Sequence, residues 1–102
     1  MSEPKAELTN PQKRFLIKLG MELDASIWIG KDGVNDGIIK NTRAALLAHE
    51  LVKLKVNQNN EDGPSAAIDS LASALNAEIV QVIGRTALLY KAHPEKPKLR
   101  LP

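Results

Sequence analysis

Hydrophobic residues recur along this chain with two different spacings. In two segments the apolar side chains return every three or four residues, which is the repeat of one face of a helix. The inward-facing positions expected there are Ile38, Ile39, Thr42, Ala45 and Leu46, followed further on by Ile68, Leu71, Ala72 and Leu75. With a shorter apolar stretch near the start, the pattern predicts three helices: about Pro11 to Leu19, about Asn35 to His49, and a third from Pro64 or Ser65 to about Leu75.

The start of the first helix can be interpreted in two ways. Pro11 suits the first helical position after an Asn10 cap, whereas Thr9 and Gln12 have the spacing of a capping box. Gly20 is a natural end to this helix in either case.

Other segments alternate between apolar and polar residues, as strands with one buried face do. The clearest is Leu51 to Val56, in which Lys53 and Lys55 point away from the apolar positions. The pattern predicts four strands, at Ile27 to Ile29, Leu51 to Val56, Glu78 to Ile83 and Ala87 to Lys91. Gly84-Arg85 between the last two fits a two-residue hairpin turn of type II′, which requires glycine at its first central position.

The resulting α-β-α-β-α-β-β order indicates an α/β fold with a four-stranded mixed sheet and packed helices. Strands separated by helices usually run parallel, so the first three strands should end at one common edge. That edge would carry the Gly30–Gly33 loop, the Asn57–Gly63 loop and the Gly84-Arg85 turn. This topology places Lys31 and Arg85 on the same side of the molecule, where α/β sheets favour ligands.

Composition narrows the classes of function. A length of 102 residues with 43% hydrophobic content suits one domain, and the absence of cysteine excludes disulfides, thiolate metal sites and a cysteine nucleophile. No segment has the length and apolarity of a membrane helix, and the start lacks a signal pattern, so we expect a cytoplasmic protein. The expected organisation is a domain over 8–91, a flexible lead-in over 1–7 and an extended basic tail over 92–102.

The Gly30-Lys31-Asp32-Gly33 loop is the strongest candidate for a binding site. Glycines between a strand and a helix let the backbone approach a phosphate, and the following helix offers unpaired N–H groups. Lys31 adds a cation, but Asp32 cancels its charge, and a simple tight turn explains the same four residues. The net charge of +2 is too small to identify a nucleic-acid binder by itself.

Three segments together resemble a known family. Ile29-Gly30-Lys31-Asp32-Gly33-Val34, the run from His49 to Val56 and the run from Gln81 to Tyr90 follow the order and spacing of the CRM domain. This chloroplast RNA splicing and ribosome maturation family includes stand-alone bacterial proteins of the YhbY type. The resemblance extends from about Leu8 to Tyr90 and so covers nearly the whole chain.

The resemblance implies a fold similar to the C-terminal domain of translation initiation factor 3 and an RNA-binding function without cofactors. Stand-alone members associate with precursors of the large ribosomal subunit, so ribosomal RNA is the implied partner. By position, Gly30, Lys31 and Gly33 would clamp the RNA backbone, as the corresponding loop of KH domains does. Further basic residues match the family's first helix, its second strand and its hairpin tip: Lys13 and Arg14, Lys53 and Lys55, and Arg85.

Other interpretations stay open at this point. A protein-interaction module without RNA contact would leave Lys53 and Lys55 as a solvated strand face. An enzyme is disfavoured because no cysteine, paired histidine or phosphate-binding Lys-Ser/Thr loop occurs. Trp28 could stack a base, but we expect it to pack under a neighbouring helix. The sequence sets neither the particular RNA and its sequence specificity, nor the oligomeric state, the effect of Asp32 on affinity, or ordering of the tail on binding.

Overall fold

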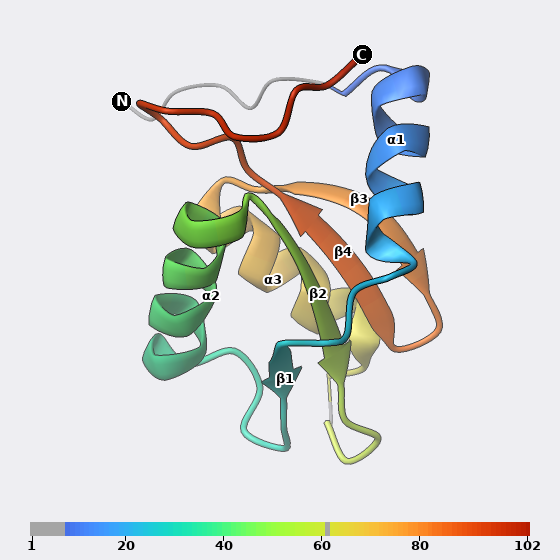
Figure 1. The fold of residues 1–102 in the computed structure, drawn as a ribbon. Helices are drawn as coiled ribbons and strands as arrows, with labels where there is room; N and C mark the ends of the chain where they lie inside the picture. The colour runs from blue at the N-terminus through green and yellow to red at the C-terminus, as the bar shows by residue number, and fades with distance from the viewer. Residues whose placement is uncertain (1–7, 61) are drawn as a thin grey trace.

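The computed structural model describes residues 8–60 and 62–102 and has the element order expected from the sequence. The expected lead-in over 1–7 lies outside the described residues. Three helices are present: α1 (Asn10–Gly20), α2 (Asp36–His49) and α3 (Pro64–Leu75). The strands are β1 (Ile27–Ile29), β2 (Leu51–Val56), β3 (Glu78–Ile83) and β4 (Thr86–Tyr90), as Figure 1 shows.

The four strands form one mixed sheet in the order β1-β2-β4-β3. β1 pairs parallel with β2, whereas β4 lies between β2 and β3 and is antiparallel to both. The first three strands therefore run in the same direction, and their carboxyl ends meet at one edge of the sheet. This confirms the α/β class and the common edge that the sequence predicts.

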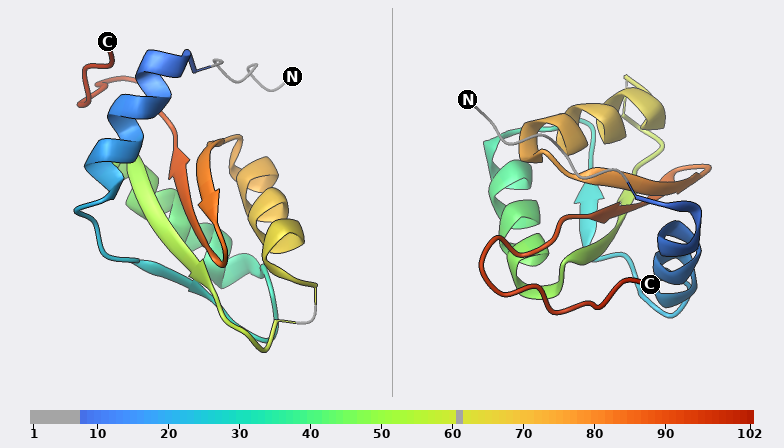
Figure 2. Two further views of the ribbon diagram at one scale, coloured as in Figure 1. Left: turned by 90° about the vertical axis from the view of Figure 1, so that its right-hand side faces the viewer. Right: turned by 90° about the horizontal axis from the view of Figure 1, so that it is seen from above.

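Helices cover both faces of the sheet, with α2 and α3 on one face and α1 on the other (Figure 2). The main core lies under α2 and α3, where alternate residues of the strands meet the two apolar helix stripes. A smaller cluster lies under α1 and centres on Leu16, Leu51, Val80, Leu88 and Tyr90. Within the described residues, no helix has both the length and the apolar character needed to cross a membrane.

Local interactions fix where α1 begins and how closely it packs. Thr9 caps the helix: its Oγ1 accepts from the Gln12 N–H at 3.2 Å, and the Gln12 side chain accepts from the Thr9 N–H at 2.9 Å. The capping-box interpretation is confirmed, and the Asn10 cap is wrong. At the other end, a Cβ on Gly20 would stand 2.4 Å from a methyl group of Leu88, so a larger residue there would force the Leu88 side chain to shift.

The hairpin between β3 and β4 has the predicted two-residue turn, because Ile83 pairs directly with Thr86. Gly84 takes a φ of +58°, while Arg85 is not among the described non-glycine residues with positive φ. Positive φ at the first central position alone is the signature of type II′. The turn therefore places Arg85 between the end of β3 and the start of β4, at the carboxyl edge.

Glu50 organises the opposite end of the molecule. Its carboxylate is fully buried and accepts hydrogen bonds from the backbone N–H groups of His93, Lys98 and Leu99. Burial raises the pKa of Glu50, but these hydrogen bonds and the nearby His93 outweigh it, so the pKa lies below its ordinary value. The segment 92–102 contains no helix or strand, yet three of its backbone N–H groups bond to this one carboxylate.

The same segment closes the smaller core. Leu99 and Leu101 pack against this buried cluster, as do Phe15 and Leu19 of α1. Figure 1 shows this C-terminal segment crossing toward α1, at the end of the molecule away from the carboxyl edge. The tail is thus part of the folded unit, a role that its Pro- and Lys-rich composition does not indicate.

Candidate nucleic-acid interface

Three connections meet at the carboxyl edge, a name used here for the Gly30–Gly33 loop, the loop over 57–63 and the Gly84-Arg85 turn. The Asn57 N–H donates to the Ile29 carbonyl at 2.8 Å, which continues the pairing of β1 and β2 past their ends. Asn60 Nδ2 donates to the Gly30 carbonyl at 2.9 Å, and Arg85 Nη1 donates to the Asn57 carbonyl at 3.2 Å. These bonds bring Lys31 and Arg85 to one edge, as the topology predicts.

The Gly30–Gly33 loop is a hydrogen-bonded turn. The Gly33 N–H donates to the Gly30 carbonyl at 3.1 Å. Gly33 is buried and has a φ of +73°, a backbone conformation that is strained for any residue with a side chain. Lys31 and Asp32 project from the turn and are exposed. The loop can therefore present the Lys31 ammonium to an anion while Gly33 fixes the path of the chain into α2.

The amino end of α2 is less open to an anion than the sequence suggests. Asn35 caps the helix, since its Oδ1 accepts from the Ile38 N–H at 2.9 Å, and Asp36 lies in the first turn. Asp62 also lies close to the loop, with its Oδ2 3.8 Å from where a Cβ on Gly33 would stand. Together with Asp32, these carboxylates make the side of the loop that faces α3 unfavourable for phosphate.

Cations gather on the other side of the loop. Arg85 is half-buried against the Asn57 carbonyl, and Lys55 is exposed one residue before the end of β2. The Lys55 ammonium lies 5.6 Å from the centre of the Trp28 ring, within the range of a cation–π interaction. The carboxyl edge thus has an acidic side toward α3 and a basic side toward β2 and β4.

The structure corrects the interpretation of Trp28. The sequence predicts packing under a helix, but Trp28 is 52% exposed. α1 packs on the part of the sheet that carries Leu51, Val80, Leu88 and Tyr90, and it does not reach over β1. Since an isolated strand pattern carries no information on helix coverage, the sequence could not decide this.

The remaining basic residues named by the family resemblance lie at different places. Lys53 is half-buried, and its ammonium donates to the Leu23 carbonyl at 2.9 Å, in the connection before β1. Lys13 and Arg14 lie in the first half of α1, beside residues that pack at the end of the sheet opposite the carboxyl edge. The structure therefore groups Lys31, Lys55 and Arg85 and separates Lys13 and Arg14 from them.

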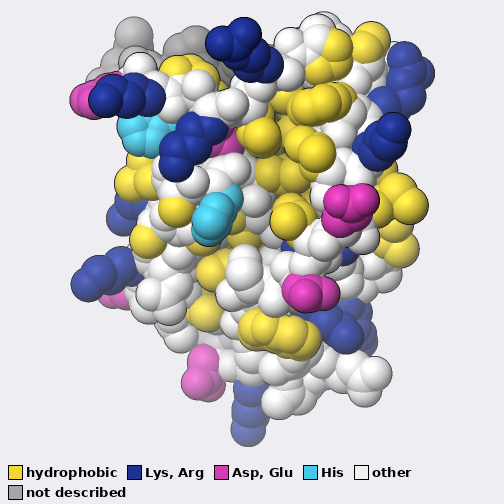
Figure 3. Space-filling model, viewed as in Figure 1, with side chains coloured by type: hydrophobic (Ala, Val, Ile, Leu, Met, Phe, Trp, Pro, Cys, Tyr) yellow, Lys and Arg dark blue, Asp and Glu magenta, His cyan; other side chains and the backbone are white. Residues whose placement is uncertain are grey.

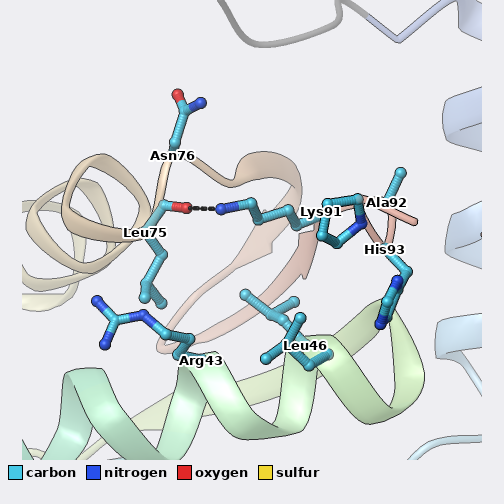
Figure 4. A pocket seen from close by; sticks show the side chains of 9 residues that line it. Arg43, Leu46, Leu75, Asn76, Lys91, Ala92 and His93 are labelled. Atoms are coloured by element: carbon cyan, nitrogen blue, oxygen red, sulfur yellow. Dashed lines mark hydrogen bonds between the residues drawn. The ribbon is translucent and has the colours of Figure 1, made fainter. Parts of the chain in front are cut away.

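A hollow that the sequence does not predict lies between α2, α3 and the segment after β4. It has a volume of about 350 Å³, an apolar floor that includes Leu46 and Leu75, and Arg43 and His93 at its rim (Figure 4). Lys91 spans one side, where its ammonium donates to the Leu75 carbonyl at 2.8 Å. Lys91 directly follows β4, so this bond connects the end of β4 to the end of α3.

Charges on the visible surface are mixed. Figure 3 shows basic side chains along the top, sides and bottom of the face seen in Figure 1, interrupted by acidic ones and by a central hydrophobic band. No continuous basic surface covers this face. A ligand that carries negative charge would therefore be attracted to local clusters, of which the one at the carboxyl edge combines two lysines, an arginine and an exposed indole.

Comparison with known proteins relates most of the chain to one family. The family model of the CRS1 / YhbY (CRM) domain matches residues 8–91. The chain is 40% identical over 95 residues to the Bacillus subtilis protein named Probable RNA-binding protein YqeI, covering 93% of this chain and 99% of that protein. It is 31% identical over 91 residues to the Pseudomonas aeruginosa Probable RNA-binding protein PA4753, with 89% and 88% covered.

A solved structure agrees with these sequence matches. The solution structure of the Staphylococcus aureus protein SAV1595 superposes with a TM-score of 0.76 at 38% identity, covering 94% of this chain and 100% of that one. The order and spacing of the Gly30–Gly33 loop, β2 and the β3–β4 hairpin are those on which the resemblance rests. The chain belongs to the CRS1 / YhbY (CRM) domain family.

Proposed function

We propose that this protein binds RNA through the carboxyl edge of its sheet and acts in assembly of the large ribosomal subunit. The observation that carries the proposal is the grouping of Lys31 from the Gly30–Gly33 loop, Lys55 from β2 and Arg85 from the hairpin turn around Gly30 and Asn57. The family and the names of the relatives support RNA as the ligand. The role is binding and docking, without chemistry on the RNA.

The charges at this edge favour one path for the RNA backbone. Phosphates would approach Lys31 from the side of Arg85 and Lys55, because Asp32 and Asp62 oppose an approach from α3. The turn at Gly30–Gly33 keeps bulky side chains away from the backbone near Lys31. Contacts of this kind fix position and carry little sequence information, so we expect low intrinsic sequence specificity.

Salt dependence tests the phosphate contacts. If ~3–5 phosphates of a single strand are neutralised, the logarithm of the binding constant should fall with the logarithm of salt concentration with a slope of roughly −2 to −4. Fluorescence anisotropy of a labelled single-stranded RNA at several salt concentrations measures this slope. A binding constant independent of salt would contradict the mechanism.

A charge reversal locates the contacts. Lys31→Glu combined with Arg85→Glu should abolish measurable RNA binding while the circular dichroism spectrum stays native. Lys96→Glu combined with Arg100→Glu is the matched control, because it changes the same residue types and the same net charge on exposed tail positions. Equal losses from both pairs would show that only overall charge matters and would contradict a site at the carboxyl edge.

The ribosomal role needs a separate measurement. We expect the protein to sediment with precursors of the large subunit in a sucrose gradient of cell extract, and the Lys31→Glu and Arg85→Glu double variant to remain at the top. If the double variant lost RNA binding but still sedimented with the particles, protein contacts would be the basis of association. That outcome would favour a protein-interaction module over direct RNA contact.

A further inference from the structure

One row of residues crosses the entire sheet on the same face as α1, in the part of that face that α1 does not cover. Trp28 pairs with Lys55, Lys55 pairs with Thr86, and Thr86 pairs with Ile83, so the four side chains stand side by side on four successive strands. Three strand spacings make the row about 14 Å long. Trp28 and Ile83, at its two ends, are 52% and 65% exposed.

This row adjoins the carboxyl edge directly. Trp28 is two residues before Gly30, and Thr86 follows Arg85, so the row is the last one on this face before the loops begin. Trp28 and Ile83 thus leave large apolar surfaces open to a ligand at the two ends of the row, with Lys55 beside the indole. Within this row there is no acidic residue.

We propose that the row is a platform for unstacked nucleobases of single-stranded RNA, with Trp28 as the stacking residue. The inference rests on the proposed function, since it assigns the bases of the same RNA whose phosphates meet Lys31 and Arg85. An indole stacks on any base because every base has a π-face. A strand held at Gly30 and Lys31 would bring its neighbouring base over Trp28, on the same edge strand.

The charges around the row favour a nucleic acid over an apolar peptide. Lys55 lies over one face of the indole at 5.6 Å from its centre, which leaves its ammonium able to pair with a phosphate beside a stacked base. Glu22 and Asp24 lie near Lys53, in the connection that leads into β1, away from the carboxyl edge. These carboxylates disfavour phosphate at that end and so direct the backbone toward the loops.

Trp28 is the only tryptophan of the chain, so its fluorescence reports on the platform alone. The experiment titrates the native protein with a short oligouridine RNA and with an abasic strand of the same length and charge. We expect the oligouridine to quench the emission and the abasic strand, although bound through its phosphates, to leave it nearly unchanged. Equal quenching by both strands would overturn the platform.

Substitutions give an independent measure of affinity. Trp28→Leu should weaken oligouridine binding roughly 5- to 150-fold, the range expected for one stacked base, while Trp28→Phe should retain most of it. The salt slope should stay as in the native protein, because no phosphate contact is removed. Leu47→Ala is the matched control, since Leu47 is a comparably exposed apolar residue on α2, beyond the opposite face of the sheet.

The outcomes separate this inference from the function on which it rests. If Trp28→Leu binds oligouridine as the native protein does, while Lys31→Glu with Arg85→Glu abolishes binding, the platform is wrong and the phosphate site stands. If the native protein binds neither strand at any salt concentration, the proposed function itself fails, and the platform fails with it. A loss with Trp28→Leu that exceeds the loss with Leu47→Ala, in a natively folded variant, supports the platform.

Discussion

The carboxyl edge and the end of the molecule around Glu50 handle charge in opposite ways. At the edge, Lys31 and Lys55 are exposed, and the described contacts of their ammonium groups are limited to one ring. Around Glu50, a single buried carboxylate is saturated by three backbone N–H groups of the tail. The carboxyl edge leaves its positive charges available to a ligand. At the other end, the negative charge of Glu50 is used within the protein to hold the tail against the fold.

The comparison teaches which charged residues of this protein are free to act. Both ends contain basic residues, and the tail over 92–102 is the more basic in sequence. The tail is nevertheless occupied by Glu50 and by the packing of Leu99 and Leu101, while the edge has cations from one loop, from β2 and from the hairpin turn, with an open part of the sheet beside them. Density of lysine and arginine along the chain is therefore a poor guide to the binding surface.

The largest effect should come from removing the charge at the closed end. Glu50→Gln keeps the shape of the side chain but replaces one accepting oxygen by a donor facing the backbone N–H groups of the tail. We expect the free energy of unfolding to fall by about 2–3 kcal/mol, as for loss of hydrogen bonds to a charged group. Urea denaturation measures the loss.

Hydrogen exchange gives the control for this variant. The amides of His93, Lys98 and Leu99 should exchange faster in Glu50→Gln, while those of β2 below the carboxyl edge keep their relative protection. RNA affinity should change little, since the edge is built from other residues. An RNA affinity that falls with Glu50→Gln in the folded protein would break the distinction between the two ends.

Acidification should release the tail without any substitution. The folded-state pKa of Glu50 lies below its ordinary value of 4.5, so its stabilising contribution is complete above that pH. The contribution is lost as the pH falls through the folded-state pKa, because protonation removes the acceptor. Stability measured against pH should therefore show a decline below about 4.5 that is absent in Glu50→Gln; identical profiles for both proteins would contradict this role.

A smaller effect is expected from loosening the open end. Asn60 is buried, donates to the Gly30 carbonyl at 2.9 Å and accepts from the Asp62 N–H at 3.1 Å. Asn60→Ala leaves these backbone groups without that partner and should cost about 1–2 kcal/mol of stability. RNA affinity should fall several-fold as Lys31 loses its fixed position; Asn59→Ala, at an exposed neighbouring position, is the control.

The smallest effect should come from Lys13→Glu combined with Arg14→Glu. The family resemblance assigns these residues to RNA binding, but they lie toward the other end of the sheet from Lys31 and Arg85. For a short oligouridine we expect affinity within about threefold of native at physiological salt, where screening acts over roughly 8 Å. A loss as large as that of Lys31→Glu with Arg85→Glu would show that the RNA path extends along α1.

Much of the fold was predictable because short-range sequence patterns specify each helix, strand and turn. The bounds of β1, β2 and β3 agree with the structure residue by residue, and those of the helices and β4 agree within one residue. Apolar spacing, glycine positions and the II′ turn are short-range signals that each element carries within itself. The common edge followed from them because a right-handed crossover leaves few arrangements open.

The site was predictable only in part. The loops that the sequence predicts to lie together do meet at one edge. The amino end of α2, however, is partly occupied by the side chains of Asn35 and Asp36. Trp28 is exposed, although the sequence predicted that it packs under a helix. The sequence did not mark Glu50 as the anchor of the tail, because the residues that bond to its carboxylate are far away along the chain. Its φ of +65° and its bonds to residues more than forty positions away become visible only in the folded chain.

The sequence by itself determined the order of helices and strands, the type of the hairpin turn and the family of the chain, since these depend on neighbours along the chain. The tertiary structure alone decided that α1 leaves the row from Trp28 to Ile83 uncovered and that the tail returns to Glu50. Both depend on which distant segments exclude water from which surface, and that is settled by packing in three dimensions.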